Sequence, residues 1–158
     1  MTVRRATQDD LDAVARLVTA LGDQHVALDP RRFQFPEPPR PAHAAFFREQ
    51  IASDEARVLV ACVDDLVVGY AFVRREPASL LDARDESVWL HDLHVEPSHR
   101  ATGLGRALMA AAWDAAAELG ASRLYIIVAA ANAAALRLFA RHGFTTTMVE
   151  MAADRPDP

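Results

Sequence analysis

The sequence predicts an α/β (α+β) fold in which helices pack on a mixed β-sheet. Three observations lead to this fold class. Apolar runs rich in β-branched residues alternate with helical patterns along the 158 residues. Two of these runs, residues 57–63 and 66–74, are separated only by Asp64 and Asp65, which predicts an antiparallel hairpin. Other runs are joined through helical segments, and such crossovers place strands side by side in parallel.

The elements of the first half follow from periodicity and turn residues. Residues 3–6 predict a short strand, after which Thr7 is a suitable N-cap for a helix with one apolar face that reaches about Leu21. Five prolines between Gly22 and Pro41 predict a shaped loop, because each proline removes a main-chain donor. A second helix is expected over residues 42–53, before the hairpin.

The second half begins with a polar connection over residues 76–86. Strands are then predicted over residues 87–95, 123–128 and 144–151, and helices between them over residues 103–119 and 132–142. Gly120 and Gly143 each follow a helical run, as C′ glycines do. The length is typical of one domain, and 51% hydrophobic residues supply a core, so we expect a single domain over residues 1–158.

Composition and charge exclude several classes of protein. The formal net charge is −5 and no basic tract is present, so nucleic acid is not an expected partner and cationic substrates are slightly favoured. No run approaches the roughly 18 apolar residues of a membrane span, and no apolar signal region is seen, so we expect a cytoplasmic protein without a membrane partner. Cys62 lies in a strand-like run and is expected to be structural. No group of residues has metal-ligand spacing, so no metal site is predicted.

An anion-binding turn is predicted after the strand over residues 87–95. Pro97 is followed by Arg100, Gly103 and Gly105, in the pattern R-x-x-G-x-G, and then by a helix. The unpaired N–H groups and the dipole at a helix start favour a diphosphate, and glycines let the main chain approach it. Glycines before a helix can also be simple turn residues. A nucleotide or dinucleotide enzyme is disfavoured, because the P-loop lysine and the third glycine of the dinucleotide pattern are missing.

This segment resembles the acetyl-CoA signature of the GCN5-related N-acetyltransferase (GNAT) superfamily. The strand Leu93-x-Val95-x-Pro97 matches the family's strand end in register with the glycines. A second block, from Asn132 to Phe144, resembles the family's N-x-x-A-x-x-L-Y-x-x-x-G-F pattern. The order of elements also resembles the GNAT fold over nearly the whole chain. The resemblance implies a mixed, mostly antiparallel central sheet of six to seven strands flanked by about four helices.

The resemblance further implies an acetyl-CoA-dependent N-acetyltransferase. Acetyl-CoA would be the co-substrate, and the acceptor would be a primary amine of a small cationic or amino-acid-like molecule that attacks directly in a ternary complex. A homodimer is also expected by analogy. The cofactor-binding residues implied are Leu93, His94, Val95, Arg100, Ala101, Thr102, Gly103, Leu104, Gly105, Arg106, Asn132 and Phe139. Asn132 at a helix start is also an ordinary N-cap.

The catalytic residues expected are His91, Asp92 and Leu93. Either His91 or Asp92 would accept the amine proton, while a main-chain N–H near Leu93 would bind the thioester oxygen if the strand bulges there. Successive strand residues face opposite sides, so only one of the two bases reaches the site unless a bulge intervenes.

Phe139 departs from the family pattern. It stands where relatives have a tyrosine that protonates the departing thiolate, and a phenyl ring has no proton to give. This favours, as an alternative, an acyl-CoA-binding or regulatory module with little transferase activity.

Overall fold

The computed structural model describes residues 1–34 and 39–155. The chain forms two compact units, residues 1–127 and the residues from 128 onward. Residues 35–38 of the predicted proline-rich loop lie outside the described part. No helix within the described ranges is both long enough and apolar enough to cross a membrane.

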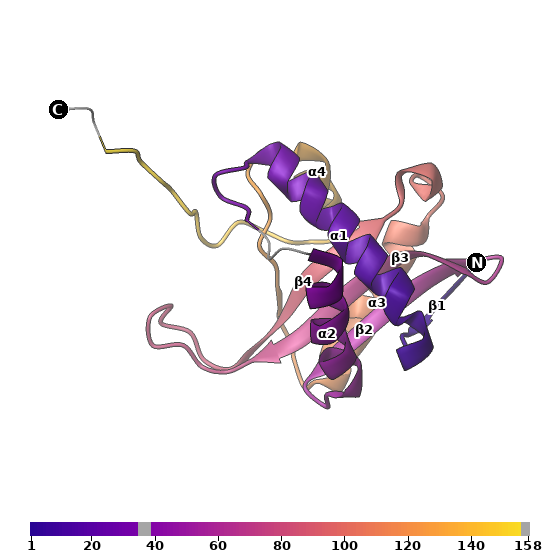
Figure 1. Ribbon diagram of the computed structural model, residues 1–158. Helices are drawn as coiled ribbons and strands as arrows, with labels where there is room; N and C mark the ends of the chain where they lie inside the picture. Colours follow the sequence, from indigo (N-terminus) through magenta and orange to yellow (C-terminus); the bar gives the residue numbers. More distant parts are fainter. Residues whose placement is uncertain (35–38, 156–158) are drawn as a thin grey trace. The chain divides into compact units, whose positions relative to one another are not determined.

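A five-stranded sheet in the described residues forms the centre of the first unit (Figure 1). Its order follows the chain: β1 (Thr2–Arg5), β2 (Ala56–Val63), β3 (Leu66–Glu76), β4 (Ser87–Val95) and β5 (Leu124–Tyr125). The first four strands pair as antiparallel neighbours, and β5 lies parallel to β4. The predicted hairpin is confirmed, with Asp64 and Asp65 both at positive φ, as a two-residue type I′ turn requires.

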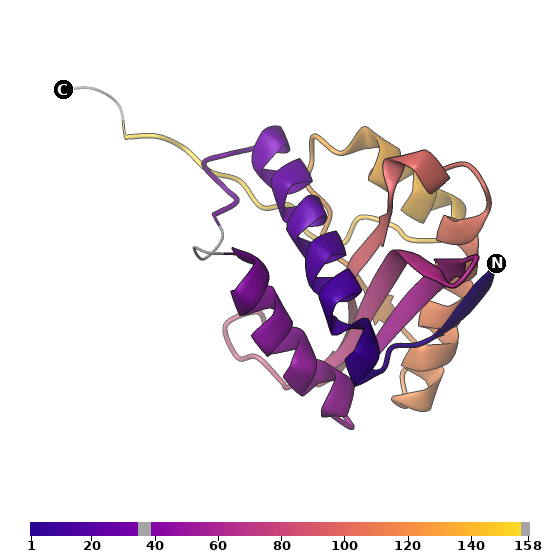
Figure 2. The same cartoon turned by 45° about the vertical axis from the view of Figure 1, so that its right-hand side comes forward.

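Two helices cover one face of the sheet. α1 (Leu11–Leu28) and α2 (Pro39–Ala52) share a buried cluster with alternate residues of β2 and β3, among them Tyr70 and Phe72 (Figure 2). Thr7 precedes a short 3₁₀ turn, η1 (Gln8–Asp10), that leads into α1. Asp10 is buried and accepts hydrogen bonds from the Arg4 guanidinium at 2.7 and 2.9 Å and from the Thr7 N–H at 2.8 Å. These bonds fix where α1 begins.

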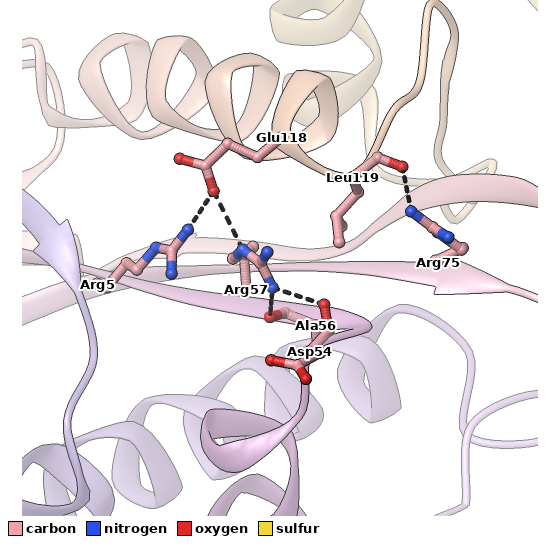
Figure 3. Close-up of polar contacts among 7 residues, drawn as sticks. All are labelled: Arg5, Asp54, Ala56, Arg57, Arg75, Glu118 and Leu119. Atoms are coloured by element: carbon pink, nitrogen blue, oxygen red, sulfur yellow. Dashed lines mark hydrogen bonds and ion pairs between the residues drawn. The ribbon is translucent and has the colours of Figure 1, made fainter.

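α3 (Leu104–Glu118) packs on the opposite face of the sheet, against the residues of β3 that alternate with Tyr70 and Phe72. A Cβ at Gly69 would lie 2.9 Å from the His94 carbonyl oxygen and 3.4 Å from Leu108 of α3, so only glycine fits between β4 and this helix. The C-terminal end of α3 is tied to the sheet, as Figure 3 shows: Glu118 accepts from Arg5 and Arg57, and Arg75 Nη2 donates to the Leu119 carbonyl at 2.6 Å. The helix is thereby held at its C-terminal end. Its N-terminal end follows the turn that contains Arg100, Gly103 and Gly105, which we call the glycine turn.

Three sequence predictions require correction. α1 continues to Leu28, so part of the predicted loop after Gly22 is helical; a buried glycine inside a helix costs only about 1 kcal/mol, which packing offsets. The strand predicted over residues 123–128 is reduced to β5, and no strand is present at 144–151, so the described sheet has five strands rather than six to seven. A strand exists only where a neighbour's main chain pairs with it, and local sequence does not supply that neighbour.

Candidate active site

A β-bulge in β4 places two titratable side chains on the same face of the sheet. Phe72 of β3 pairs with Asp92, and the next residue, Val73, pairs with Leu90, so His91 is the extra residue. Asp92 shares the face of its partner Phe72. The His91 ring also stacks on Phe72, with centroids 5.2 Å apart and an interplanar angle of 29°. Strict alternation would have separated these two side chains, whereas the bulge puts both on the face that α1 and α2 cover.

His91 is oriented by an acid from the neighbouring strand. Its Nε2 lies 2.9 Å from Glu76 Oε1, and 35% of its side chain is exposed. Partial burial lowers the pKa of His91 below its usual value, and the Glu76 carboxylate opposes this effect. The neutral form of the ring is therefore favoured. If Nε2–H donates to Glu76, Nδ1 is left as a free acceptor.

Asp92 lies among buried polar groups. Burial raises the pKa of Asp92 to about 6, and the Tyr70 hydroxyl partly opposes the rise. Tyr70 is fully buried, and burial and the Asp92 charge raise the pKa of its phenol well above the usual value. The Tyr70 hydroxyl lies near Asp92 but makes no hydrogen bond of normal geometry, and His94 Nε2 has no hydrogen-bond partner among the described residues. Buried polar atoms without partners are uncommon, and they are compatible with a water or ligand beside Asp92.

His94 is held neutral in the same region. Only 5% of it is exposed, and burial lowers its pKa to about 4, helped by the positive charge of Arg100. Tyr70 is its direct cross-strand partner, so the two side chains share a face. The Asp92 carboxyl on this side of β4 therefore lies beside the His94 ring and the Tyr70 phenol, both of which are neutral at neutral pH.

The outer edge of β4 is open beyond its first residues. β5 pairs with β4 only at Val88 and Trp89, and no other strand in the described residues pairs with that edge. The Glu96 N–H donates to the Val68 carbonyl of β3 at 2.9 Å. Because main-chain groups alternate in direction along a strand, those of Leu93 and Val95 point to the open edge. By the same alternation, the main chain of His94 faces β3, so it lies away from that edge.

The glycine turn follows directly. A 3₁₀ turn, η2 (Pro97–His99), leads to Arg100, whose Nε donates to the Val95 carbonyl at 3.0 Å and whose Nη2 donates to Gln24 of α1 at 3.2 Å. Thr102 Oγ1 donates to the His99 carbonyl at 2.7 Å. These bonds fix the turn against β4 and α1, so its main-chain amides have a defined direction.

The main-chain amides at the start of α3 are unpaired. The first hydrogen bond of the helix runs from the Ala107 N–H to the Gly103 carbonyl at 3.0 Å, and the N–H groups of residues 102–106 have no acceptor in the described part of the chain. A Cβ added at Gly103 or Gly105 would meet no heavy atom within 4 Å. Gly103 has φ +94°, which explains its glycine, but Gly105 has no positive φ. Neither packing nor conformation therefore requires glycine at 105.

The second unit contains the block from Asn132 to Phe144. Asn132 is the N-cap of α4 (Ala133–Arg141), and its Oδ1 accepts from the Ala135 N–H at 3.1 Å. Phe139 lies on α4, with its ring edge-to-face against Phe144 at 5.5 Å. The predicted helix is thus present, and the capping role of Asn132 is real.

Tyr70 and Glu76 were not singled out from the sequence as parts of the site. Tyr70 sits in an apolar run, whose pattern indicates only a core position; the strand register shows that it is the partner of His94. Glu76 is fifteen residues from His91, and a regular hairpin register gives no reason to expect contact between them. The bulge, which sequence does not reveal, turns His91 toward it.

The chain belongs to the acetyltransferase (GNAT) family, whose sequence pattern matches residues 24–144. This region includes the bulged strand, the glycine turn and the whole block from Asn132 to Phe144. The family assignment confirms the resemblance drawn from R-x-x-G-x-G, and the fold class agrees with it.

Individual relatives are similar over parts of their length. Streptothricin acetyltransferase of Streptomyces lavendulae is 35% identical over 91 residues, which cover 57% of this chain and 45% of that protein. An uncharacterized N-acetyltransferase of Mycobacterium tuberculosis is 33% identical over 64% of this chain and 60% of its own length. The chain thus spans about half the length of these curated relatives.

Solved structures share the fold over the whole chain. A mutant of the BH1408 protein from Bacillus halodurans has a TM-score of 0.85 at 23% identity and covers 99% of this chain and 100% of its own. An aminoglycoside N-acetyltransferase, AAC(6')-Iy, in complex with CoA has a TM-score of 0.74 at 16% identity and covers 99% of this chain and 100% of its own. At these identities the likeness establishes the fold.

Proposed function

We propose that the protein is an acetyl-CoA-dependent N-acetyltransferase that acylates a primary amine by direct attack in a ternary complex. One observation carries this proposal: unpaired amides at an open glycine turn lie directly after a strand whose free edge begins beside Asp92. Family membership supports it, as does the fold shared with an aminoglycoside N-acetyltransferase bound to CoA.

The described residues fit coenzyme A at two places. In the proposal, the amides of residues 102–106 hold the diphosphate, with Arg100 and Ala101 at the border of the turn. Open space in front of Gly103 and Gly105 allows the close approach that this requires. The free edge at Leu93 and Val95 pairs with the pantetheine arm as an added strand would. Asn132 and Phe139, which belong to the second unit, stay predictions of the family resemblance.

Asp92 is the proposed base. Acetyl-CoA supplies an activated acyl carbon; as the amine nitrogen bonds to it, the C–S bond breaks, CoA leaves as the thiolate and the amine proton passes to Asp92, directly or through a water. With a pKa raised to about 6, the carboxylate is ionised at neutral pH yet basic enough to take a proton. His91, the second candidate, has one ring nitrogen occupied by Glu76. The Leu93 N–H at the free edge is the proposed donor to the thioester oxygen.

The acceptor is proposed to be a small amine. Similar proteins carry the names streptothricin acetyltransferase and mycothiol acetyltransferase, the latter 34% identical over 113 residues and matched over 36% of its length. The net charge of −5 favours cations in general. A homodimer is proposed by analogy with the family, while a single domain and a cytoplasmic location stay predictions of the sequence.

Thiol release from acetyl-CoA tests the proposal. The protein is incubated with acetyl-CoA and a panel of primary amines, and free thiol and acetylated amine are measured together. We expect amine-dependent release in equal amounts, a rate that rises with pH through about 6, and a loss of at least about 100-fold in Asp92→Asn. If Asp92 is the base, the rate of His91→Gln should still rise with pH through about 6. If this rise is lost in His91→Gln but not in Asp92→Asn, His91 is the base.

The binding-module alternative rests on Phe139, which has no proton to donate. It predicts saturable CoA binding in calorimetry with no amine-dependent thiol. Absence of CoA binding at low salt would reject both functions.

A further inference from the structure

A row of aromatic rings crosses the face of the sheet beside Asp92. Tyr125 of β5 stacks on Trp89 of β4, with centroids 5.1 Å apart, and Trp89 is followed by His91 at 6.5 Å. His91 stacks on Phe72, and Phe46 of α2 meets Phe72 edge-to-face at 5.8 Å. We call these five side chains the aromatic strip. Its continuity depends on the bulge, because only the extra residue brings His91 between Trp89 and Phe72.

The aromatic strip is partly open among the described residues. Phe46 is 41% exposed, and the His91 side chain is 35% exposed. Trp89 and Tyr125 are half-buried, and only Phe72 is fully covered. Several neighbouring rings that are partly open form a flat apolar surface that a ligand can cover. In Figure 1, α2 lies over this side of the sheet and the β3–β4 connection extends beyond it.

Charge is distributed unequally along the aromatic strip. At its outer end the guanidinium of Arg84 lies 5.4 Å from the centre of the Trp89 ring, and that of Arg123 lies 5.0 Å from the centre of Tyr125. At its inner end, Asp92 is beside His91, and the Glu76 carboxylate lies 2.9 Å from His91 Nε2. An ammonium group is therefore attracted at the inner end and repelled at the outer end.

We propose that the acceptor is a monoamine that carries a flat aromatic group, with the amine at Asp92 and the ring against Phe46 and His91. The inference rests on the proposed function, because Asp92 receives the amine there. It narrows the acceptor class: a polycation would have to place a second charge near Arg84 and Arg123. A carboxylate or other anion at the far end of the ligand would instead be tolerated by these arginines.

Three matched amines test the inference. The amines are 2-phenylethylamine, 2-cyclohexylethylamine, which has the same length but no flat ring, and spermidine. We expect kcat/KM for phenylethylamine to exceed that for cyclohexylethylamine by roughly threefold to tenfold, the range of an aromatic contact beyond its area. Spermidine should be at least about tenfold poorer than phenylethylamine, because like charges repel.

Variants assign the preference to the aromatic strip. Phe46→Leu keeps apolar volume but removes the ring, so it should reduce kcat/KM for phenylethylamine by about threefold to tenfold and leave spermidine within about twofold. Leu66→Ala, at an exposed residue of the hairpin, is the matched control and should change neither. Equal rates for the three amines, or equal losses for all of them in Phe46→Leu, would overturn the inference.

A fluorescence measurement separates this inference from the proposed function. In a Trp113→Phe background Trp89 is the only tryptophan, and phenylethylamine with CoA present should change its emission with a saturable dependence that cyclohexylethylamine reaches only at higher concentration. If no amine is acetylated but this signal is seen, the transferase proposal fails while the aromatic strip stands. If amines are acetylated and the signal is absent, the inference fails alone.

Discussion

Gly105 offers the sharpest test of the ligand site, because the fold by itself does not need this glycine. It is the second residue of α3, it has no positive φ, and a Cβ there would meet no heavy atom within 4 Å. Alanine is preferred over glycine in a helix by about 0.5–1 kcal/mol. Gly105→Ala should therefore leave stability unchanged or raise it by up to about 1 kcal/mol, which is roughly 2–4 °C in Tm for a chain of this size.

The same substitution should weaken coenzyme A binding. The methyl group would occupy the space through which the diphosphate approaches the amides of residues 102–106. Losing one hydrogen bond to a charged group costs about 1.5–3 kcal/mol, so Kd for CoA should rise by about 10-fold to 150-fold. Calorimetric titration with CoA and thermal unfolding of the same samples measure both quantities.

Two neighbouring glycines supply controls. Gly103→Ala should lose both affinity and about 1–2 kcal/mol of stability, because its φ is +94°. Gly120→Ala, at φ +80° beyond the other end of α3, should lose stability but keep its affinity for CoA. Undiminished CoA affinity in Gly105→Ala, with normal folding, would refute the assignment of this turn to the diphosphate.

Other predictions concern stability and pH. Folding lowers the pKa of His94 to about 4, so the unfolded chain binds the His94 proton more tightly than the folded chain does. The free energy of unfolding therefore decreases as pH falls below about 6.5. In urea denaturation, His94→Asn should reduce the decrease between pH 7 and pH 5 by about 2 kcal/mol. Asp92 affects stability in the opposite direction, because its raised pKa of about 6 makes the folded state more stable as pH falls from about 7 to 4. Asp92→Asn should abolish this gain. If the dependence of stability on pH is the same in Asp92→Asn as in the parent protein, Asp92 is not buried. Asp10→Ala should cost about 2 kcal/mol at pH 7, since it removes the Arg4 ion pair and the acceptor of the Thr7 N–H ahead of α1, and a loss below about 0.5 kcal/mol would contradict that role.

Most elements could be predicted from the sequence because their determinants are local. The hairpin at Asp64 and Asp65, the helix after the glycine turn and the N-cap at Asn132 each depend on a few consecutive residues. The strand expected after Gly143 did not appear, because a strand is defined by pairing with another segment rather than by its own pattern.

The candidate site divides in the same way. The spacing of Arg100, Gly103 and Gly105 predicts an anion-binding turn, since the amides and the glycines that expose them are consecutive in the chain. The base could be narrowed only to His91 or Asp92, because alternation in a regular strand would have placed them on opposite faces.

The sequence by itself determined the order of the elements, the glycine turn and the family. Only the tertiary structure decided that β4 bulges at His91, that Glu76 contacts its ring and that Tyr70 lies beside Asp92. The physical reason is that these features depend on the register between β3 and β4. Register is set by packing across the whole sheet, so a change of one residue in pairing alters which side chains meet without changing any local pattern.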